Sequence, residues 1–344
     1  MRRAFILLGM VLGLLAASTA SAADVVKTRD SKVEGMVTAT SPTEVTVSQN
    51  GTTKAVPVNE IEWITFDEEP TPLQRARTDV SRGQFEAALK AVDTIKLDEV
   101  ARDEIKQDIE FLSAISTARL ALQGEVEFSE AEKLLTAFLS AHPKSYHQLE
   151  ASEVLGELLM AAGQFAKARE CYERVGKAPW PEYKLRAAVA VGQILLAEKK
   201  PQEAMKFFQY VLDSKAEDDQ AAAQRSVAAL GKARCLADAS KPDEAIKIAE
   251  EVIAKADAED AELLGRAYLV LGIAQRKAGR SQDALYALLH VDAMYSVNRE
   301  THAEALYHLV GVWSEVKKPG RSDEARRTLA EEFGDTRWAE AIKQ

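Results

Sequence analysis

The side chains that could perform chemistry in this chain do not form the arrangements of known catalytic or metal sites. The five histidines are His142, His147, His290, His302 and His308. None belongs to an HExxH motif, and His302 and His308 are six residues apart, too far out of phase to share one helical face and bind zinc. A glycine-rich phosphate loop and a GxSxG serine motif are also absent from the sequence. We therefore expect a protein that is not an enzyme and uses no cofactor or metal.

Acidic residues are abundant, with 54 Asp and Glu against 44 Lys and Arg. On helices such side chains are mostly solvated, so no pair stands out as the two carboxylates of a glycosidase. The formal charge of −10 argues against nucleic acid as a partner, because that affinity comes mainly from neutralising phosphates. The acidity is expected mainly to keep the protein soluble.

A short signature recurs at least five times: a branched apolar residue, Gly, a break seven residues later, and then Ala. The glycines, separated by 36, 39, 41 and 39 residues, are Gly156, Gly192, Gly231, Gly272 and Gly311. The matching alanines are Ala168, Ala204, Ala245, Ala284 and Ala325. A period of this size indicates stacked helix–turn–helix units in place of one globular core. The small residues would let the two helices of a unit approach closely, and stacked units present a surface, so binding is the expected function.

The pattern resembles the tetratricopeptide repeat (TPR) family, which places a large apolar residue and Gly in helix A, and Ala and an aromatic residue in helix B. The period is longer than the usual one and the early Trp of helix A is missing, so a related helical repeat is the alternative. The resemblance implies a mostly α-helical, right-handed TPR-like helical-hairpin solenoid over residues 70–344. Its clearest units are expected at 147–182, 184–219, 221–258, 261–297 and 301–334, after two weaker ones, with a C-terminal capping helix in 335–344 whose N-cap is Asp335.

In TPR proteins the inner helices line a concave groove, at fixed positions around the packing glycine. In the three middle units those positions include Arg186, Gln193, Arg225, Lys232, Arg266 and Arg276, which are five cations, one amide and no acid. The resemblance thus implies a groove for a segment of a partner protein, with an acidic stretch or free carboxylate held by the cations. The alternative is that these cations pair with Glu residues of neighbouring helices.

Residues 1–22 have the pattern of a secretory signal peptide. Arg2 and Arg3 precede an apolar run over residues 4–17, and Ala20-Ser21-Ala22 matches a cleavage site. Because the run is short for a membrane span, we expect a periplasmic or secreted protein with no stable membrane anchor after cleavage; an uncleaved anchor is the alternative. Cleavage would change the formal charge from −10 to −12.

The two cysteines, Cys171 and Cys235, are separated by a whole predicted hairpin. A disulfide needs Cα atoms within about 7 Å. We therefore predict two buried free thiols in spite of the oxidising destination.

Residues 23–69 change in character, with short segments rich in Val, Ile and Thr that alternate in polarity. Asn50-Gly51 predicts a type I′ hairpin turn. Five strands in so short a stretch favour a small five-stranded β barrel, SH3-like or Sm-like, docked on the first helices because it buries little core alone. Four basic against nine acidic residues in 24–69 argue against RNA, and the two aromatic residues, Trp63 and Phe66, are expected in the core.

The leading hypothesis is a non-catalytic protein–protein interaction scaffold in the cell envelope that binds a partner segment in the concave face. One alternative is a glycan- or cell-wall-binding protein that uses the β module. Another is an accessory subunit of an envelope enzyme or of a secretion or assembly complex. Homo-oligomerisation through Trp180, which lies between two prolines, is a further alternative; packing between repeats would also explain this residue.

Overall fold

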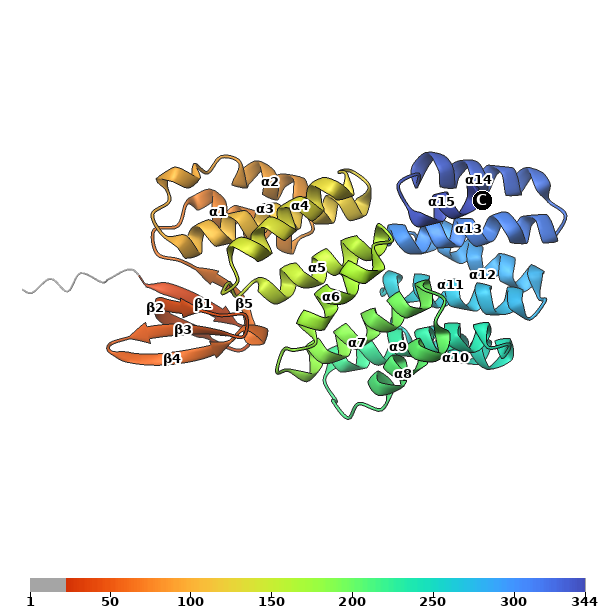
Figure 1. Ribbon diagram of the computed structural model, residues 1–344, viewed down its shortest axis with the longest axis horizontal. Helices are drawn as coiled ribbons and strands as arrows, with labels where there is room; N and C mark the ends of the chain where they lie inside the picture. Colours follow the sequence, from red (N-terminus) through yellow and green to blue (C-terminus); the bar gives the residue numbers. More distant parts are fainter. Residues whose placement is uncertain (1–22, 344) are drawn as a thin grey trace, which may run out of the picture.

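The structure is a computed structural model that describes residues 23–343, so the predicted signal peptide lies outside the described residues. A small antiparallel sheet begins the described chain and helical hairpins follow it to the end, where α15 lies beside α13 and α14 (Figure 1). Among the described helices, none combines the length and the apolar character that crossing a membrane requires.

The strands are β1 (Asp24–Thr28), β2 (Lys32–Thr40), β3 (Glu44–Gln49), β4 (Thr52–Pro57) and β5 (Ile61–Thr65), with a 3-10 turn η1 (Val58–Glu60) before β5. Asn50 and Gly51 join β3 to β4 with φ angles of 50° and 78°, which confirms the predicted primed turn. The strand order is β4-β3-β2-β1-β5 and every neighbouring pair is antiparallel.

This sheet is open, so the predicted closed barrel is wrong. In the strand order β4 and β5 are the two edges, and no pairing joins them within the described residues. The inner face is covered by helices instead: Val26, Val37 and Ile64 belong to the same buried cluster as Leu73 and Ala76 of the first helix. Since helices supply the cover that closure would otherwise provide, the strands do not need to curl round on themselves.

The helices are α1 (Thr71–Ser81), α2 (Phe85–Val92), η2 (Leu97–Glu99), α3 (Asp103–Gln123), α4 (Phe128–Ala141), α5 (Gln148–Ala161), α6 (Phe165–Val175), α7 (Pro181–Ala197), α8 (Pro201–Leu212), α9 (Asp219–Asp238), α10 (Pro242–Lys255), α11 (Ala261–Lys277), α12 (Ser281–Met294), α13 (Arg299–Glu315), α14 (Pro319–Glu332) and α15 (Arg337–Lys343). They pair as seven hairpins, from α1/α2 to α13/α14, followed by α15. The helical-hairpin solenoid is therefore confirmed. The start of α15 differs from the prediction, because Thr336 Oγ1 accepts from the Ala339 amide while Asp335 pairs with Arg299.

The repeated glycines are sites of close helix contact. A Cβ placed on Gly156, Gly192 or Gly272 would lie 2.7 Å from a side chain of the second helix of the same unit: Tyr172, Phe208 and Leu288, respectively. Each of these side chains comes four residues after the repeated alanine. Gly231 packs on Phe208 as well, which belongs to the preceding unit. Gly311 differs, since the guanidinium of Arg276 covers it.

The first helices of the units form the inner layer of the solenoid. From α7 onwards they pack on one another, α7 on α9, α9 on α11 and α11 on α13, whereas each second helix lies between its own first helix and the next one. The series is interrupted once, where α7 packs on α6 and makes few contacts with α5.

The sheet is attached to the helices by buried polar contacts as well as by the shared core. The Asp24 carboxylate accepts hydrogen bonds from both terminal nitrogens of Arg102, at 2.7 and 2.8 Å. It also accepts hydrogen bonds from the backbone amides of Val37 and Asp67. Further along, the Asn59 amide donates to Glu182 at the start of α7. The sheet therefore contacts the solenoid at two places far apart in the sequence.

The sequence predictions also concern two cysteines and three aromatic side chains. Cys171 and Cys235 are buried and free, as predicted, and burial raises their thiol pKa values to about 11 and about 12. Trp180 is half-buried, packs against the main core cluster and lies tilted on Tyr183 with ring centres 5.2 Å apart, which agrees with a packing role. Trp63 is 46% exposed, so its predicted core position is wrong, whereas Phe66 is buried. Trp63 pairs with Lys27 on the solvent face while Ile64 points inward.

Candidate partner-binding surface

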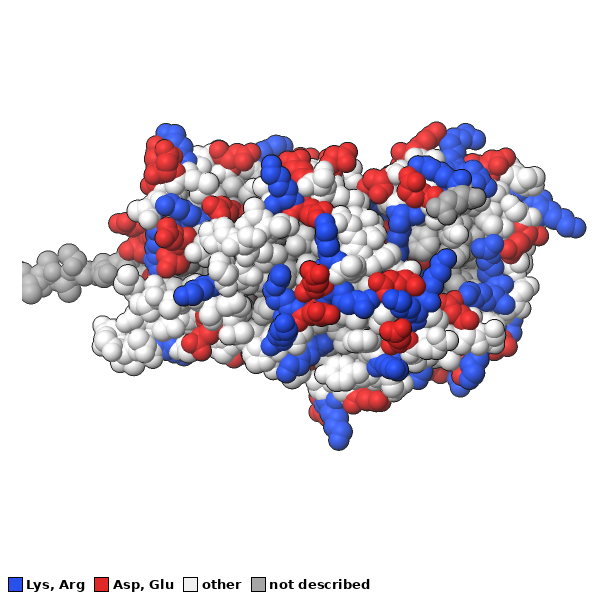
Figure 2. Space-filling view, viewed as in Figure 1, with Lys and Arg blue, Asp and Glu red and all other residues white. Residues whose placement is uncertain are grey.

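The six predicted groove residues lie on three successive inner helices. Arg186 and Gln193 belong to α7, Arg225 and Lys232 to α9, and Arg266 and Arg276 to α11; all six are half-buried. Figure 2 shows basic and acidic side chains intermixed across the middle of the molecule, with no broad area of one sign on the face in view. The cations must therefore be considered together with the acids beside them.

Arg186 lies next to a carboxylate of the preceding unit. Its Nε is 3.0 Å from Glu153 of α5, and its guanidinium lies 4.2 Å from the centre of the Tyr183 ring. Burial raises the pKa of Glu153 to about 7, because Arg186 only partly offsets the desolvation and Glu157 and Glu150 oppose ionisation. Near neutral pH the Arg186 charge is thus only partly balanced.

Arg276 and Arg266 are also paired with acids. Arg276 contacts Glu315 of α13 at 2.8 Å, across neighbouring units, and Arg266 contacts Glu262 of its own helix at 2.7 Å. Pairing with Glu of a neighbouring helix, the alternative left open by the sequence, therefore describes Arg186 and Arg276. The Glu262 carboxylate is 56% exposed, so its pair with Arg266 is a solvated one.

Arg225 and Lys232 differ from the other cations, since within residues 23–343 no carboxylate lies within 4.0 Å of either one. Arg225 donates to the carbonyl of Ala216 at 2.6 Å, in the connection between α8 and α9, and Lys232 donates to Gln209 at 3.2 Å. Both partners are neutral. The inner surface of α9 consequently carries two positive charges that no acid of the described chain balances.

The structure adds a charged cluster that the sequence prediction missed. Arg234 of α9 has Nη2 2.8 Å from Glu304 of α13, close enough for an ion pair although the two are not aligned for a hydrogen bond. Burial opposes the charge of Glu304, but Arg234 and His308 outweigh it and lower the pKa of Glu304 to about 2. Burial lowers the pKa of His308, which therefore favours the neutral imidazole.

A sequence signal for such pairs exists in retrospect. Many ion pairs join opposite charges about one repeat period apart: Arg119 with Glu157 at 38 residues, Arg276 with Glu315 at 39 and Arg337 with Glu300 at 37. This spacing matches that of the repeated glycines, because equivalent positions of neighbouring units face each other. Arg234 and Glu304 are nearly two periods apart, so a search at one period would still miss them.

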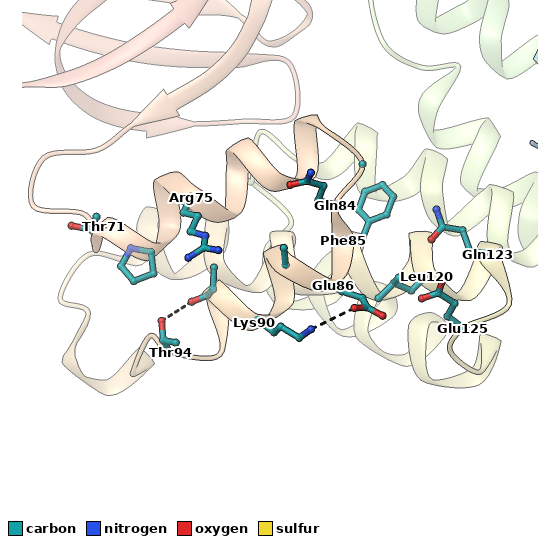
Figure 3. A pocket seen from close by; sticks show the side chains of 14 residues that line it. Thr71, Arg75, Gln84, Phe85, Glu86, Lys90, Thr94, Leu120, Gln123 and Glu125 are labelled. Carbon is teal, nitrogen blue, oxygen red and sulfur yellow. Dashed lines mark hydrogen bonds and ion pairs between the residues drawn. The ribbon is translucent and has the colours of Figure 1, made fainter.

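A hollow lies on the first hairpin, away from the predicted groove residues (Figure 3). It has a volume of about 780 Å³, between α1, α2 and the last turn of α3. Phe85 and Leu120 give it an apolar wall, while Arg75, Lys90 and Glu125 stand around it. The hollow arises because α2 has 8 residues and covers only part of α3, which has 21.

One histidine, His147, belongs to a polar cluster around the buried Asp108. His147 stacks on Phe111 and has Nε2 3.0 Å from Asp108, which also accepts from Arg77 and Tyr146. Burial alone would raise the pKa of Asp108, but Arg77 and His147 hold it below its usual value. This cluster links α1 and α3 to the segment before α5. Over the part of the chain that the structure describes, no three potential ligand side chains gather as a metal site would require.

Comparison with known proteins agrees with this architecture. The sequence pattern of the tetratricopeptide repeat family matches residues 118–179 and 154–222. No curated protein matches the sequence. Among solved structures, a tetratricopeptide repeat protein from Parabacteroides merdae is similar at 17% identity and a TM-score of 0.53, over 75% of this chain and 90% of that one. A Rap protein complexed with Competence and Sporulation Factor is similar at 13% identity and a TM-score of 0.57, over 79% and 77%.

At these identities the structural likeness concerns the fold alone. Residues 118–222 match the sequence pattern of tetratricopeptide repeats, and the helices form a TPR-like solenoid.

Proposed function

We propose that this protein is a non-catalytic scaffold of the cell envelope that binds a segment of another protein along the inner face of α7, α9 and α11. The observation that carries the proposal is the pair of uncompensated cations on α9, Arg225 and Lys232, each bonded only to a neutral group. Arg266 on the next inner helix adds a third charge, whose own acid is solvated. A carboxylate-bearing segment would gain charge-assisted hydrogen bonds there without first breaking a buried ion pair.

Further support comes from the fold. A solenoid of this kind exposes an extended concave surface, on which partner segments are commonly bound. The Rap protein of similar fold is seen in complex with another molecule, Competence and Sporulation Factor. By analogy of fold only, we infer that the inner face is the binding surface here as well.

The test uses a fluorescein-labelled oligoglutamate peptide and a neutral Gln analogue, with binding followed by fluorescence anisotropy. Changing Arg225, Lys232 and Arg266 to Gln together should weaken oligoglutamate binding about tenfold or more. Each lost charge-assisted contact is worth roughly 1.5–3 kcal/mol where it is buried and less where it is solvated. Affinity of the unchanged protein should fall with added salt.

A matched control removes the same number of charges from the outer helices. Lys206 of α8 and Lys247 and Lys255 of α10 are exposed and form no ion pair with the described residues. Their triple Gln variant should bind as the unchanged protein does. Equal loss in both triple variants would show that only net charge matters, and equal binding of the Gln analogue would refute the acidic-segment proposal.

Export is part of this proposal and is supported by the sequence of residues 1–22. Fractionation of cells that express the full chain should recover a shortened protein outside the cytoplasm, and its amino-terminal sequence should begin at Ala23. A full-length protein in the cytoplasmic fraction would contradict this location.

The β module is assigned a structural role in the proposal. Trp63 is its only exposed aromatic side chain among the described residues, and stacking on sugars would be expected to need more than one. Trp63→Ala should leave both the fold and peptide binding unchanged. Loss of binding to a cell-wall glycan preparation in this variant would favour the glycan-binding alternative instead.

A further inference from the structure

The last unit of the solenoid meets units that are far earlier in the sequence. Arg299, at the start of α13, lies against Gly124 at the end of α3, so closely that a Cβ on Gly124 would be 2.6 Å from its Cζ. The guanidinium of Arg337 in α15 lies 5.7 Å from the centre of the Phe165 ring at the start of α6. We refer to these contacts, together with the Arg234–Glu304 pair, as the seam. Figure 1 shows α13 next to the ends of α5 and α6.

The seam is polar, in contrast to the contacts between successive units. The buried apolar cluster of the last units runs from Leu269 to Ala339 and contains no residue of α3 to α6. The cluster of the first units likewise contains none from α13 to α15. Arginine side chains therefore make the contacts identified across the seam, and no buried apolar cluster of the described residues spans it.

Two of the three seam arginines, Arg299 and Arg337, have their charge partners within the last unit itself. Arg299 pairs with Asp335 at 2.5 Å and lies over Phe333, and Arg337 pairs with Glu300 at 2.7 Å, all within the last unit. Gly124 ends α3 in a left-handed conformation, at φ 84°, so Arg299 faces the carbonyl end of that helix. A cation is favoured at such a position. If the seam separated, these side chains would keep their own-unit partners.

We propose that the seam is a latch that closes the solenoid on itself and that it opens when a partner segment enters the inner face. The proposal rests on the proposed function for its ligand, an acidic segment, but the latch itself depends only on the contacts described above. Closure brings Glu304 against Arg234, which lies two residues after Lys232 on α9. Opening would free the charge of Arg234 close to the surface where the partner would bind.

The first experiment measures the distance across the seam by double electron–electron resonance. Spin labels are attached at Lys133→Cys in α4 and Glu331→Cys in α14, two exposed positions that form no ion pair with residues 23–343. The native Cys171 and Cys235 are buried, so labelling is directed to the introduced thiols. The unchanged seam should give one narrow distance distribution. A broad distribution in this protein would overturn the latch.

The seam is weakened by Gly124→Asn together with Arg234→Gln. Asn tolerates the left-handed backbone better than other residues, and its side chain would displace the end of Arg299, which is flexible. The matched control is Gly163→Asn with Arg280→Gln, because Gly163 occupies the equivalent turn at φ 72° with no atom within 4 Å of a Cβ, and Arg280 forms an exposed pair with Asp243. Longer, broader distances in the seam variant but not in the control would support the latch, and identical distributions would overturn it.

A measurement on the unmutated seam guards against a folding defect in the variant. Added NaCl at about 1 M weakens the attraction of Arg299 for the carbonyl end of α3, so it should broaden the distances of the labelled protein without changing its helical circular dichroism. Distances that do not respond to salt would count against a polar latch.

The link to binding is tested with the oligoglutamate peptide. If closure withholds the inner face, the seam variant should bind about three- to tenfold more tightly than the control in spite of losing Arg234, because the closed population no longer competes. Open distances with unchanged or weaker affinity would overturn the gating role. Absence of peptide binding in every protein would count against the proposed function, while the distances would still decide whether the latch exists.

Discussion

At the scale of single residues, Phe208 is the repeat side chain that packs on two of the repeated glycines. It is fully buried, and its ring fills the space above Gly192 of its own unit and Gly231 of the next. A glycine on each side leaves room for a ring that would otherwise meet a Cβ. One side chain therefore contributes to two units at once.

We predict that Phe208→Ala lowers the free energy of unfolding by about 3–5 kcal/mol, as for other buried aromatic residues replaced by Ala. Phe207, its neighbour in α8, is 37% exposed, and Phe207→Ala should cost less than about 1 kcal/mol. Urea denaturation followed by circular dichroism compares the two. Similar midpoints for both variants would be inconsistent with the contacts described.

Glu153 provides a prediction of pH dependence. Burial raises its pKa to about 7 from an ordinary value of 4.5, so the folded state binds more protons than the unfolded state between those values. The stability that it contributes is full below about pH 4.5 and is lost as the pH rises through about 7. Relative to Glu153→Gln, the unchanged protein should lose on the order of 1–3 kcal/mol between about pH 5.5 and about pH 8.5.

Urea midpoints across this pH range provide the measurement. Glu173 of α6, which is exposed and forms no ion pair with the described residues, offers a control, since Glu173→Gln should run parallel to the unchanged protein. A constant difference between the unchanged protein and Glu153→Gln at all pH values would contradict the assigned role of burial.

At the scale of elements, the attachment of the sheet depends on one residue at its first position. Asp24 is buried and collects a two-point contact from Arg102 and two backbone amides, from Val37 and Asp67. Burial works against its charge, but Arg102 and these amides hold the pKa of Asp24 below the ordinary 3.8. The stability contributed by this carboxylate is therefore present above about pH 4 and is lost as the pH falls below it.

Asp24→Asn should cost about 2–4 kcal/mol, because it removes the buried two-point charge partner of Arg102, which would keep only the more exposed Glu104. We expect faster hydrogen–deuterium exchange in peptides from residues 24–66, with α9 to α12 unaffected. Lys27→Ala, which removes an exposed pair with Glu62 on the other face of the sheet, should change exchange little. Uniformly faster exchange over the whole chain after Asp24→Asn would contradict a local attachment.

Much of this element structure could be predicted, because local patterns specify it. The Gly and Ala period fixed the hairpins, and Asn50-Gly51 fixed a turn, since only residues that tolerate positive φ fit there. Closure of the sheet could not be predicted, because it depends on whether β4 and β5 meet or are covered, and the covering residues Leu73 and Ala76 belong to a helix. The outward position of Trp63 was missed for a related reason: alternation defines two faces but not which one is buried.

At the scale of the whole molecule, the candidate binding surface was only partly predictable. The inner positions of Arg186, Arg225 and Arg276 follow from repeat geometry, but their partners do not, because these depend on the charges of neighbouring units. The seam could not be predicted from the sequence. It depends on the small rotation between successive units added up over the whole chain, and the sequence of a single unit does not determine this total rotation.

The sharing of Phe208 between two units has a consequence for how such a protein can change by recombination. Identical repeats could be duplicated, deleted or exchanged in any order. Here the helix that follows α8 must carry Gly at the position of Gly231, because the Cβ of any larger residue would clash with the ring of Phe208. The fourth and fifth hairpins are therefore inherited together, and a graft that divides them would need a smaller side chain at position 208.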